Sequence, residues 1–381
     1  MRRIFVALRP GLHPGRPIRD PLSRLLLLAL ILSACGGKPA PSGGNAATPS
    51  SSPGESPTRP AERIPVTWSA LHLTGKLIYL AAYQAFNNPY VGIQDLDLAT
   101  GEVTTIFQTP PNGWVYGLSI SPDDRQLVIS YATPTAFPVL YTMPLDGSEA
   151  PQPLFTPPTQ DDQYLEPAWS PDGHYIYFVH VNNRLPSQEP GQQAPVEEID
   201  RVAVPAGKTE RILEKASWPR LSADSSRMVF VSENAQDGTN HLLVAHTDGS
   251  ALRPVLLSDS YVPEIIDAPF FSPDRRSILF SAPGIPASAG PSPLEKLLGI
   301  IVVEAHGGVA EDWWQVPAEG GLPTQLTHLQ TPGLYASGSP DGRYVASTSA
   351  MGLFVMNPDG TGLTMLVNDL GGISGSVSWI P

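Results

Sequence analysis

The ten residues Trp169-Ser170-Pro171-Asp172-Gly173-His174-Tyr175-Ile176-Tyr177-Phe178 decide the fold of this chain. In the Ser-Pro-Asp-Gly segment, proline fixes φ, aspartate can hydrogen-bond the nearby backbone, and glycine tolerates a positive φ. The segment therefore predicts a tight turn. The aromatic and β-branched residues that follow, from Tyr175 to Val179, predict a strand.

The same pattern recurs along the chain. Ser-Pro-Asp stands again at 121–123, 272–274 and 339–341, a degenerate Ser-Ala-Asp stands at 222–224, and a worn copy covers residues 72–80. The positions equivalent to Ser170 are thus 72, 121, 170, 222, 272 and 339, with spacings of 49, 49, 52, 50 and 67 residues. A period near 50 with only strand and turn signals is typical of a β-propeller, in which each repeat forms one blade.

Each repeat has the length and signals for four strands. A second turn, such as Asp146-Gly147, Asp248-Gly249 or Asp359-Gly360, follows the third strand, and a short outer strand such as 323–327 completes the unit. Six repeats therefore predict an all-β, six-bladed propeller of four-stranded blades over residues 64–381.

The C-terminal residues predict how the ring closes. Residues 377–381 (Val-Ser-Trp-Ile-Pro) match 167–171, the start of a repeat, but only one strand remains. A single strand cannot form a blade, but it can supply the inner strand of the first blade and so cover two open sheet edges. Residues 66–71 compete for the same position.

These Ser-Pro-Asp-Gly units, each followed by an apolar strand and an Asp-Gly turn, resemble the TolB-type β-propeller repeat over about residues 72–381. The first and fourth units depart most from the pattern. The resemblance implies binding to other proteins of the cell envelope. The same repeat also forms the non-catalytic domain of some peptidases, so the fold alone does not fix the function.

The N-terminal residues predict export and lipid anchoring. Six arginines precede or flank the apolar run 25–32, which is too short to span a bilayer and is typical of a signal peptide over 1–34. Residues 32–36 (Leu-Ser-Ala-Cys-Gly) resemble a bacterial lipobox, which implies lipidation of Cys35. An ordinary cleaved signal peptide with a free thiol is the alternative. Cys35 is the only cysteine, so no internal disulfide can form.

The stretch 36–63 predicts a disordered linker, because it is rich in Gly, Pro, Ser, Ala and Thr and has no apolar periodicity. With Cys35 it forms a tether of residues 35–63 between the membrane and the propeller.

The charge of the chain argues against nucleic acid. The whole chain carries −13, and residues 35–381 carry −18, from 17 Lys and Arg against 35 Asp and Glu. Such a surface repels phosphates. We therefore expect no nucleic-acid partner.

Candidate chemical groups are interpreted as structural. The repeated Asp123, Asp172, Asp274 and Asp341 are expected to serve their turns rather than a metal. Asp161 and Asp162 are expected to lie in a solvated acidic loop, although oxygen ligands at this spacing would suit Ca²⁺.

The sequence contains no clear histidine metal site and no complete serine nucleophile motif. His174 and His180 lie about 20 Å apart along one strand, at roughly 3.3 Å per residue, too far to share a metal. The segment 372–376 (Gly-Ile-Ser-Gly-Ser) lacks the last glycine of a nucleophile elbow. We therefore expect no catalytic, metal or cofactor-binding residue and no cofactor.

The fifth repeat carries an insertion over residues 283–312, followed by Trp313 and Trp314. Long insertions on a rigid scaffold often carry function, and an aromatic pair could bind a partner or stack on a sugar. We name Trp313 and Trp314 as a partner-binding pair. The alternative is that these residues belong to core strands of blade five.

Together these features predict an extracytoplasmic lipoprotein in which a propeller binds another envelope protein or a cell-wall component without catalysis. The alternatives are a small-ligand or carbohydrate binder and a metal-dependent hydrolase or lactonase. Three or more carboxylates, amides or imidazoles converging at one mouth of the channel would favour the enzyme.

Overall fold

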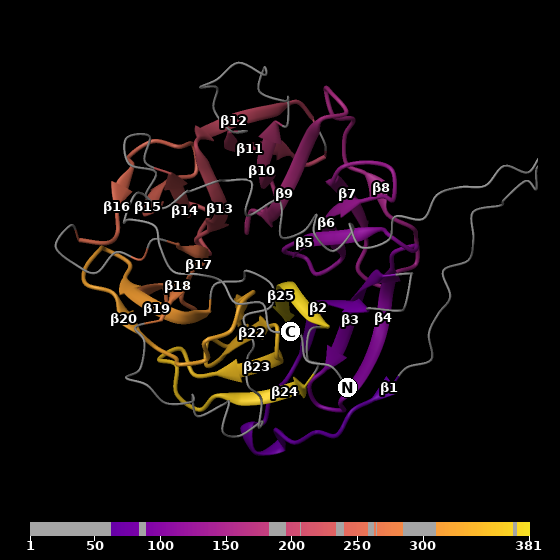
Figure 1. Cartoon of the computed structure of the whole chain (residues 1–381), viewed down its shortest axis with the longest axis vertical. Helices are drawn as coiled ribbons and strands as arrows, with labels where there is room; N and C mark the ends of the chain where they lie inside the picture. Colours follow the sequence, from indigo (N-terminus) through magenta and orange to yellow (C-terminus); the bar gives the residue numbers. More distant parts are fainter. Residues whose placement is uncertain are drawn as a thin grey trace, which may run out of the picture. The chain divides into compact units, whose positions relative to one another are not determined.

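Six antiparallel sheets make up the described part of this computed structural model. The described residues are 62–83, 89–182, 196–205, 207–233, 240–257, 263, 265–284, 310–368 and 372–381. The predicted signal peptide, Cys35 and the linker up to residue 61 lie outside them. Figure 1 shows the sheets as the blades of a propeller, each radiating from a common centre. The predicted six-bladed fold is confirmed.

In blades two to six, four strands consecutive in sequence run from the centre outward. In blade one, the last strand of the chain takes the innermost position. Blade one contains β25 (Ile373–Ile380), β2 (Lys76–Tyr83), β3 (Tyr90–Asp97) and β4 (Glu102–Gln108), with β1 (Glu62–Arg63) added outside. Blade two contains β5 (Trp114–Ile120), β6 (Gln126–Ala132), β7 (Val139–Pro144) and β8 (Gln152–Pro153). Blade three contains β9 (Asp162–Trp169), β10 (Tyr175–Asn182), β11 (Glu197–Ala203) and β12 (Thr209–Glu214).

The remaining three blades have the same order. Blade four contains β13 (Ala216–Leu221), β14 (Arg227–Glu233), β15 (Asn240–His246) and β16 (Arg253–Pro254). Blade five contains β17 (Asp267–Phe271), β18 (Ser277–Pro283), β19 (Glu311–Pro317) and β20 (Thr324–Gln325). Blade six contains β21 (Tyr335–Gly338), β22 (Val345–Ser349), β23 (Gly352–Met356) and β24 (Thr364–Asn368). The worn first unit and the degenerate fourth unit are therefore complete blades.

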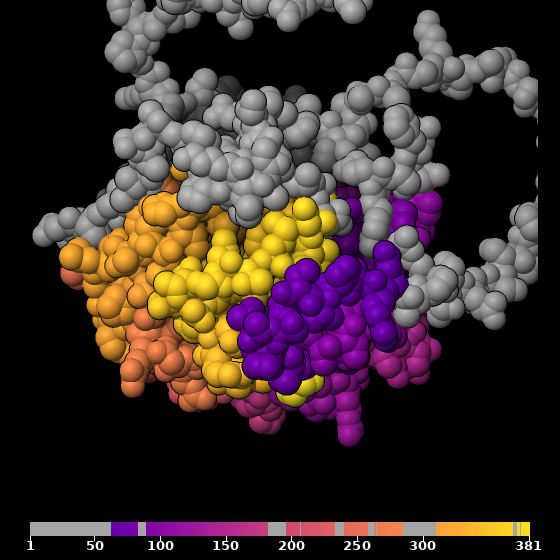
Figure 2. All heavy atoms as spheres, turned by 90° about the horizontal axis from the view of Figure 1, so that it is seen from below, coloured from indigo at the N-terminus to yellow at the C-terminus, as the bar shows by residue number. Residues whose placement is uncertain are grey.

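The C-terminal strand closes the ring, as predicted. β25 pairs antiparallel with β2, with Trp379 opposite Leu77, and each inner strand contacts the inner strands of both neighbouring blades. In Figure 2 the yellow atoms of the last blade lie directly against the indigo atoms of the first. The competing segment 66–71 forms no strand. It contains a short 3-10 turn, Ser69–Leu71, and the buried Trp68 donates its indole N–H to the carbonyl of Leu98 at 2.8 Å.

One serine hydroxyl organises each repeated turn. It donates to the carboxylate of the aspartate two residues later, at 2.6 or 2.7 Å, and accepts the backbone N–H five residues later, at 2.9 or 3.0 Å. The serine–aspartate pairs are Ser121–Asp123, Ser170–Asp172, Ser222–Asp224, Ser272–Asp274 and Ser339–Asp341. The interpretation of the repeated aspartates as turn residues is confirmed.

The second strand of each blade is buried on both faces, because neighbouring blades pack against it from both sides. In β10, Ile176, Tyr177 and Phe178 are all at most 2 % exposed. This burial explains why the strand after each Ser-Asp turn reads as a continuous apolar run rather than as an alternating pattern.

The blades give the ring two different faces. The turn face carries the Ser-Asp turns, at which each inner strand ends. The top face is the opposite one, at which the inner strands and the third strands begin. Connections between second and third strands, such as residues 133–138 between β6 and β7, lie on the top face.

Candidate functional site

The structure places the predicted partner-binding tryptophans in the core. Trp313 and Trp314 belong to β19 and are 0 % and 2 % exposed. The indole N–H of Trp313 donates to the hydroxyl of Ser347 in blade six at 2.9 Å. The pair therefore offers no exposed ring to a partner, contrary to the prediction, and behaves as the core strand that was the alternative. Residues 285–309 of the insertion lie outside the described residues.

Asp162 does not lie in a solvated acidic loop, so this part of the sequence prediction is wrong. It is the first residue of β9, and it is 2 % exposed. Its Oδ2 accepts hydrogen bonds from the backbone N–H and the hydroxyl of Thr159, both at 2.9 Å. These two bonds fix the carboxylate so that its other oxygen points toward β10.

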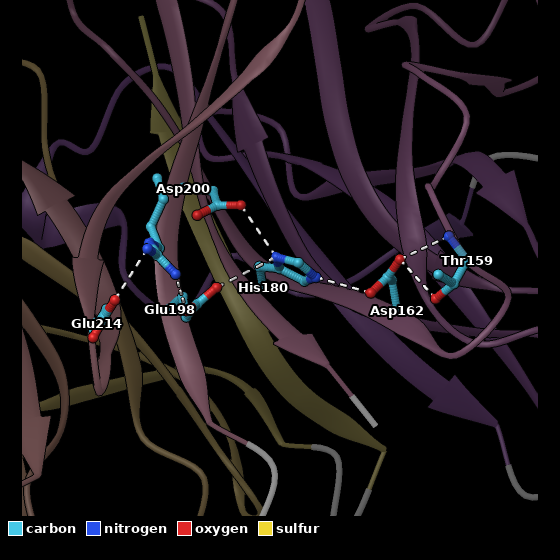
Figure 3. A network of polar contacts seen from close by, with 7 residues as sticks. Thr159, Asp162, His180, Glu198, Asp200 and Glu214 are labelled. Atoms are coloured by element: carbon cyan, nitrogen blue, oxygen red, sulfur yellow. Dashed lines mark hydrogen bonds and ion pairs between the residues drawn. The ribbon is translucent and has the colours of Figure 1, made fainter. Parts of the chain in front are cut away.

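The imidazole of His180 lies between two carboxylates (Figure 3). Its Nε2 is 3.0 Å from Oδ1 of Asp162, and its Nδ1 is 3.1 Å from Oδ2 of Asp200. In the strand register His180 lies opposite Tyr164 on β9 and opposite Glu198 on β11. Asp162 and Asp200 are each two residues from these partners, so both project from the same face of blade three as His180.

Glu198 completes the network on its outer side. Its Oε2 lies 3.9 Å from Nδ1 of His180, and its Oε1 accepts a hydrogen bond from Arg211 at 2.8 Å. Arg211 also pairs with Glu214 at 3.1 Å. We call Asp162, His180, Glu198 and Asp200 the blade-three cluster; it lies at the top-face end of the blade.

The contacts within the blade-three cluster favour the charged forms of His180 and Asp162. Burial alone would lower the pKa of His180, but its hydrogen bonds to Asp200 and Asp162 and their negative charges raise it overall. Burial alone would raise the pKa of Asp162, but hydrogen bonds from His180 and Thr159 lower it overall. The two carboxylates therefore favour the protonated form of the ring, and the ring and Thr159 favour the ionised form of Asp162.

A second group of ionisable side chains comes from the inner strands, where a β-bulge recurs. Glu166, Trp218 and Ala268 occupy equivalent positions in blades three, four and five, have φ between 46° and 59°, and each precede a proline. The pairing register shifts at each of these positions. Such bulges bend the inner strand and redirect the side chain of the bulged residue.

Trp218 links two acidic side chains of this inner region. Its backbone N–H donates to Oε2 of Glu166 at 2.7 Å, and its indole N–H donates to Oδ1 of Asp267 at 3.0 Å. Asp267 and Glu311 interact with each other within blade five. We call Glu166, Asp267 and Glu311 the inner acidic cluster.

Burial and neighbouring carboxylates raise the pKa of two members of the inner acidic cluster. Burial, then the charge of Glu197, raises the pKa of Glu166 to about 8, although Arg220 opposes the shift. Burial and the neighbouring Asp267 also raise the pKa of Glu311. A carboxyl whose pKa is raised in this way is held in its neutral form near pH 7 and would ionise beside an added cation.

Three converging carboxyls were the feature that would favour a metal-dependent hydrolase. The inner acidic cluster meets that criterion by number but not by ligand geometry. Among the residues that the structure describes, only His180, Glu198 and Asp200 bring three ligand atoms within 4.8 Å of one another. A metal at the inner acidic cluster is therefore not supported.

Both clusters were missed for the same reason, which is that they join residues of different strands or blades. His180 was compared with His174 on its own strand, whereas its partners lie on the flanking strands β9 and β11. A usable signal was present for the bulges: Glu166-Pro167, Trp218-Pro219 and Ala268-Pro269 put proline inside expected strands, which indicates a bulge.

Several solved structures have the same fold. TolB from Acinetobacter baumannii is 15 % identical with a TM-score of 0.58, over 80 % of this chain and 66 % of that chain. A putative TolB from Agrobacterium tumefaciens is 17 % identical with a TM-score of 0.52, over 73 % of this chain and 94 % of that chain. A nidogen/laminin complex matches at 10 % identity and a TM-score of 0.53, over 80 % of this chain and 97 % of that chain.

These likenesses establish a TolB-like propeller fold. This chain spans slightly less than two thirds of the Acinetobacter structure. No family model and no curated protein sequence matches the chain. In the described part of the chain, no helix has the length and apolar character needed to cross a bilayer.

The raised pKa of Glu166 predicts that the fold loses stability as pH rises. The folded state binds a proton that the unfolded state releases near pH 4.5, so this contribution is present at low pH and is lost as pH rises through about 8. Glu166→Gln keeps a neutral side chain of the same shape. We expect this variant to have a higher Tm than the wild type at pH 9 and a smaller difference at pH 5.

Thermal unfolding from pH 5 to pH 9 measures this effect, with Glu149→Gln as the control, because Glu149 is exposed. Equal pH profiles for the wild type and Glu166→Gln would contradict the assignment.

Proposed function

We propose that this chain is a lipid-anchored extracytoplasmic protein whose propeller binds another protein of the cell envelope through a basic segment of that partner, without catalysis. The predicted signal peptide and lipobox, the resemblance to the TolB-type repeat and the TolB-like fold support the envelope role. The alternatives are binding of a small ligand or carbohydrate, and hydrolysis at a metal site.

The inner acidic cluster is the observation from which we infer that the partner presents a basic segment. Glu166, Asp267 and Glu311 lie near one another with Glu197, and Arg220 is the cation that opposes the pKa shift of Glu166. A lysine, arginine or terminal ammonium group placed among them would restore the ionised carboxylates and gain their attraction. The strong negative charge of residues 35–381 would also speed the encounter with a basic surface.

The top face is the side from which such a segment would approach. Asp267 and Glu311 are the first residues of β17 and β19, so both lie at the top-face end of blade five. Glu166 and Asp267 are partly exposed. Phe137, 47 % exposed in the connection between β6 and β7, lies on the same face and is a reporter position beside blade three, because the adjacent Pro138 carbonyl accepts the backbone N–H of Tyr164 at 2.9 Å.

Membrane attachment through Cys35 predicts a simple fractionation result. Cys35→Ala removes the acylated thiol, and two acyl chains are what would hold the wild type stably on a membrane. We expect the wild type in the membrane fraction with incorporated radiolabelled fatty acid, and the variant in the soluble extracytoplasmic fraction without label. A variant that stays with the membrane, or an unlabelled wild type, would show that Cys35 is no anchor.

Partner binding is tested by a photo-crosslinking amino acid in place of Phe137 in the full-length chain, expressed in its native cell. We expect a discrete protein adduct that disappears at high salt, which screens charge attraction, and in the Glu166→Gln/Asp267→Asn background, because neither substituted side chain can ionise beside a cation of the partner. The same crosslinker at Glu149, exposed on the turn face of blade two, is the control and should give no such adduct. Adducts that are equal at both positions, or that ignore salt and both substitutions, would refute binding at the top face.

A further inference from the structure

We propose that the blade-three cluster is a binding site for one divalent transition-metal ion of the zinc class, with His180, Glu198 and Asp200 as its ligands and Asp162 as the residue that positions His180. This inference is independent of the proposed partner, because the blade-three cluster and the inner acidic cluster share no residue.

The spacing of the three ligand atoms fits a metal. Ligands about 2.1 Å from a tetrahedral metal lie about 3.4 Å from one another. Nδ1 of His180 is 3.1 Å from Oδ2 of Asp200 and 3.9 Å from Oε2 of Glu198. Small side-chain adjustments would therefore bring all three atoms to bonding distance from one ion.

Asp200 supplies an independent observation that points to a cation site. Its side chain is 9 % exposed, and its Oδ1 is buried with no hydrogen-bond partner in the described structure. A buried carboxylate oxygen without a donor is costly, because it has lost water without a replacement. A metal ion bound by both oxygens of Asp200 would satisfy Oδ1, which the contact between Oδ2 and Nδ1 of His180 leaves without a partner.

The far side of His180 has the arrangement that metal-binding histidines commonly show. Such a histidine usually donates its second ring N–H to a carboxylate, which fixes the tautomer and the ring orientation. Nε2 of His180 faces Oδ1 of Asp162, and Thr159 holds that carboxylate with two hydrogen bonds. Nδ1 faces Asp200 and Glu198 (Figure 3), and in the tautomer with the proton on Nε2 its electron pair would be available to an ion there.

The ligand chemistry selects the ion. One imidazole nitrogen and two carboxylates suit Zn²⁺ or Mn²⁺, whereas Ca²⁺ and Mg²⁺ prefer a set of oxygen ligands. Arg211 occupies Oε1 of Glu198 and leaves Oε2 for the ion. His180 and Glu198 are 17 % and 21 % exposed at their side chains, so the ion has a route from solvent and room for a water ligand.

The test is calorimetric titration of the chelator-treated full-length chain with Zn²⁺. We expect one Zn²⁺ per chain and a rise in Tm with Zn²⁺ concentration. His180→Gln and Asp200→Asn should each weaken binding by more than about 100-fold, and Asp162→Asn by about 10- to 100-fold. Ca²⁺ should bind far more weakly than Zn²⁺.

His174→Gln is the matched control, because His174 also lies beside a carboxylate, Asp172, at 3.4 Å, but is 73 % exposed. It should leave zinc binding unchanged. A Co²⁺ absorption spectrum of the wild type gives a second readout that does not depend on the folding of any variant: intense visible bands are expected for a tetrahedral site. Absence of a stoichiometric site, a spectrum like that of aqueous Co²⁺, or equal binding by the wild type, His180→Gln and Asp200→Asn would overturn the proposal.

Discussion

The pairing of β25 with β2 is the interaction on which the rest of the structure depends. A propeller has no helix or second sheet to cover its edges, so each blade is stabilised by its two neighbours and the first and last blades must meet. The last strand of the chain becomes the inner strand of the first blade, and Trp379 donates its indole N–H to the carbonyl of Thr74 at 3.0 Å. This shared sheet makes blades one and six neighbours and holds the six inner strands in one ring.

Within that ring, β-bulges in the inner strands bring the side chains of the inner acidic cluster together. The bulges at Glu166 and Trp218 allow a backbone N–H of one blade to bond a carboxylate of the next. The blade-three cluster depends instead on regular pairing around His180, which aligns this residue with side chains of both flanking strands. The inner acidic cluster thus depends on contacts between blades, whereas the blade-three cluster depends on register within one blade. The two clusters share no residue.

The fold could be read from the sequence because its determinants are local. Ser170, Pro171, Asp172 and Gly173 form a turn through their own atoms. Five recognisable copies and one worn copy were therefore enough to count six blades and to identify Asp172 and its equivalents as turn residues. The sites could not be read in the same way. Asp162 and Asp200 lie 18 and 20 residues from His180, and only the strand register makes them its partners. Trp313 was misjudged because the sequence beside an insertion does not tell an exposed aromatic from a buried one.

Hydrogen exchange of β2 tests ring closure most directly. We predict that amides of Lys76–Tyr83 are protected in the intact propeller as strongly as those of Gln126–Ala132, the equivalent strand of blade two. In a chain ending at Gly372, which lacks β25, the β2 amides should exchange much faster while β6 changes less, because only β2 loses its inner partner. Unchanged protection of β2 after this truncation would contradict closure by the C-terminal strand.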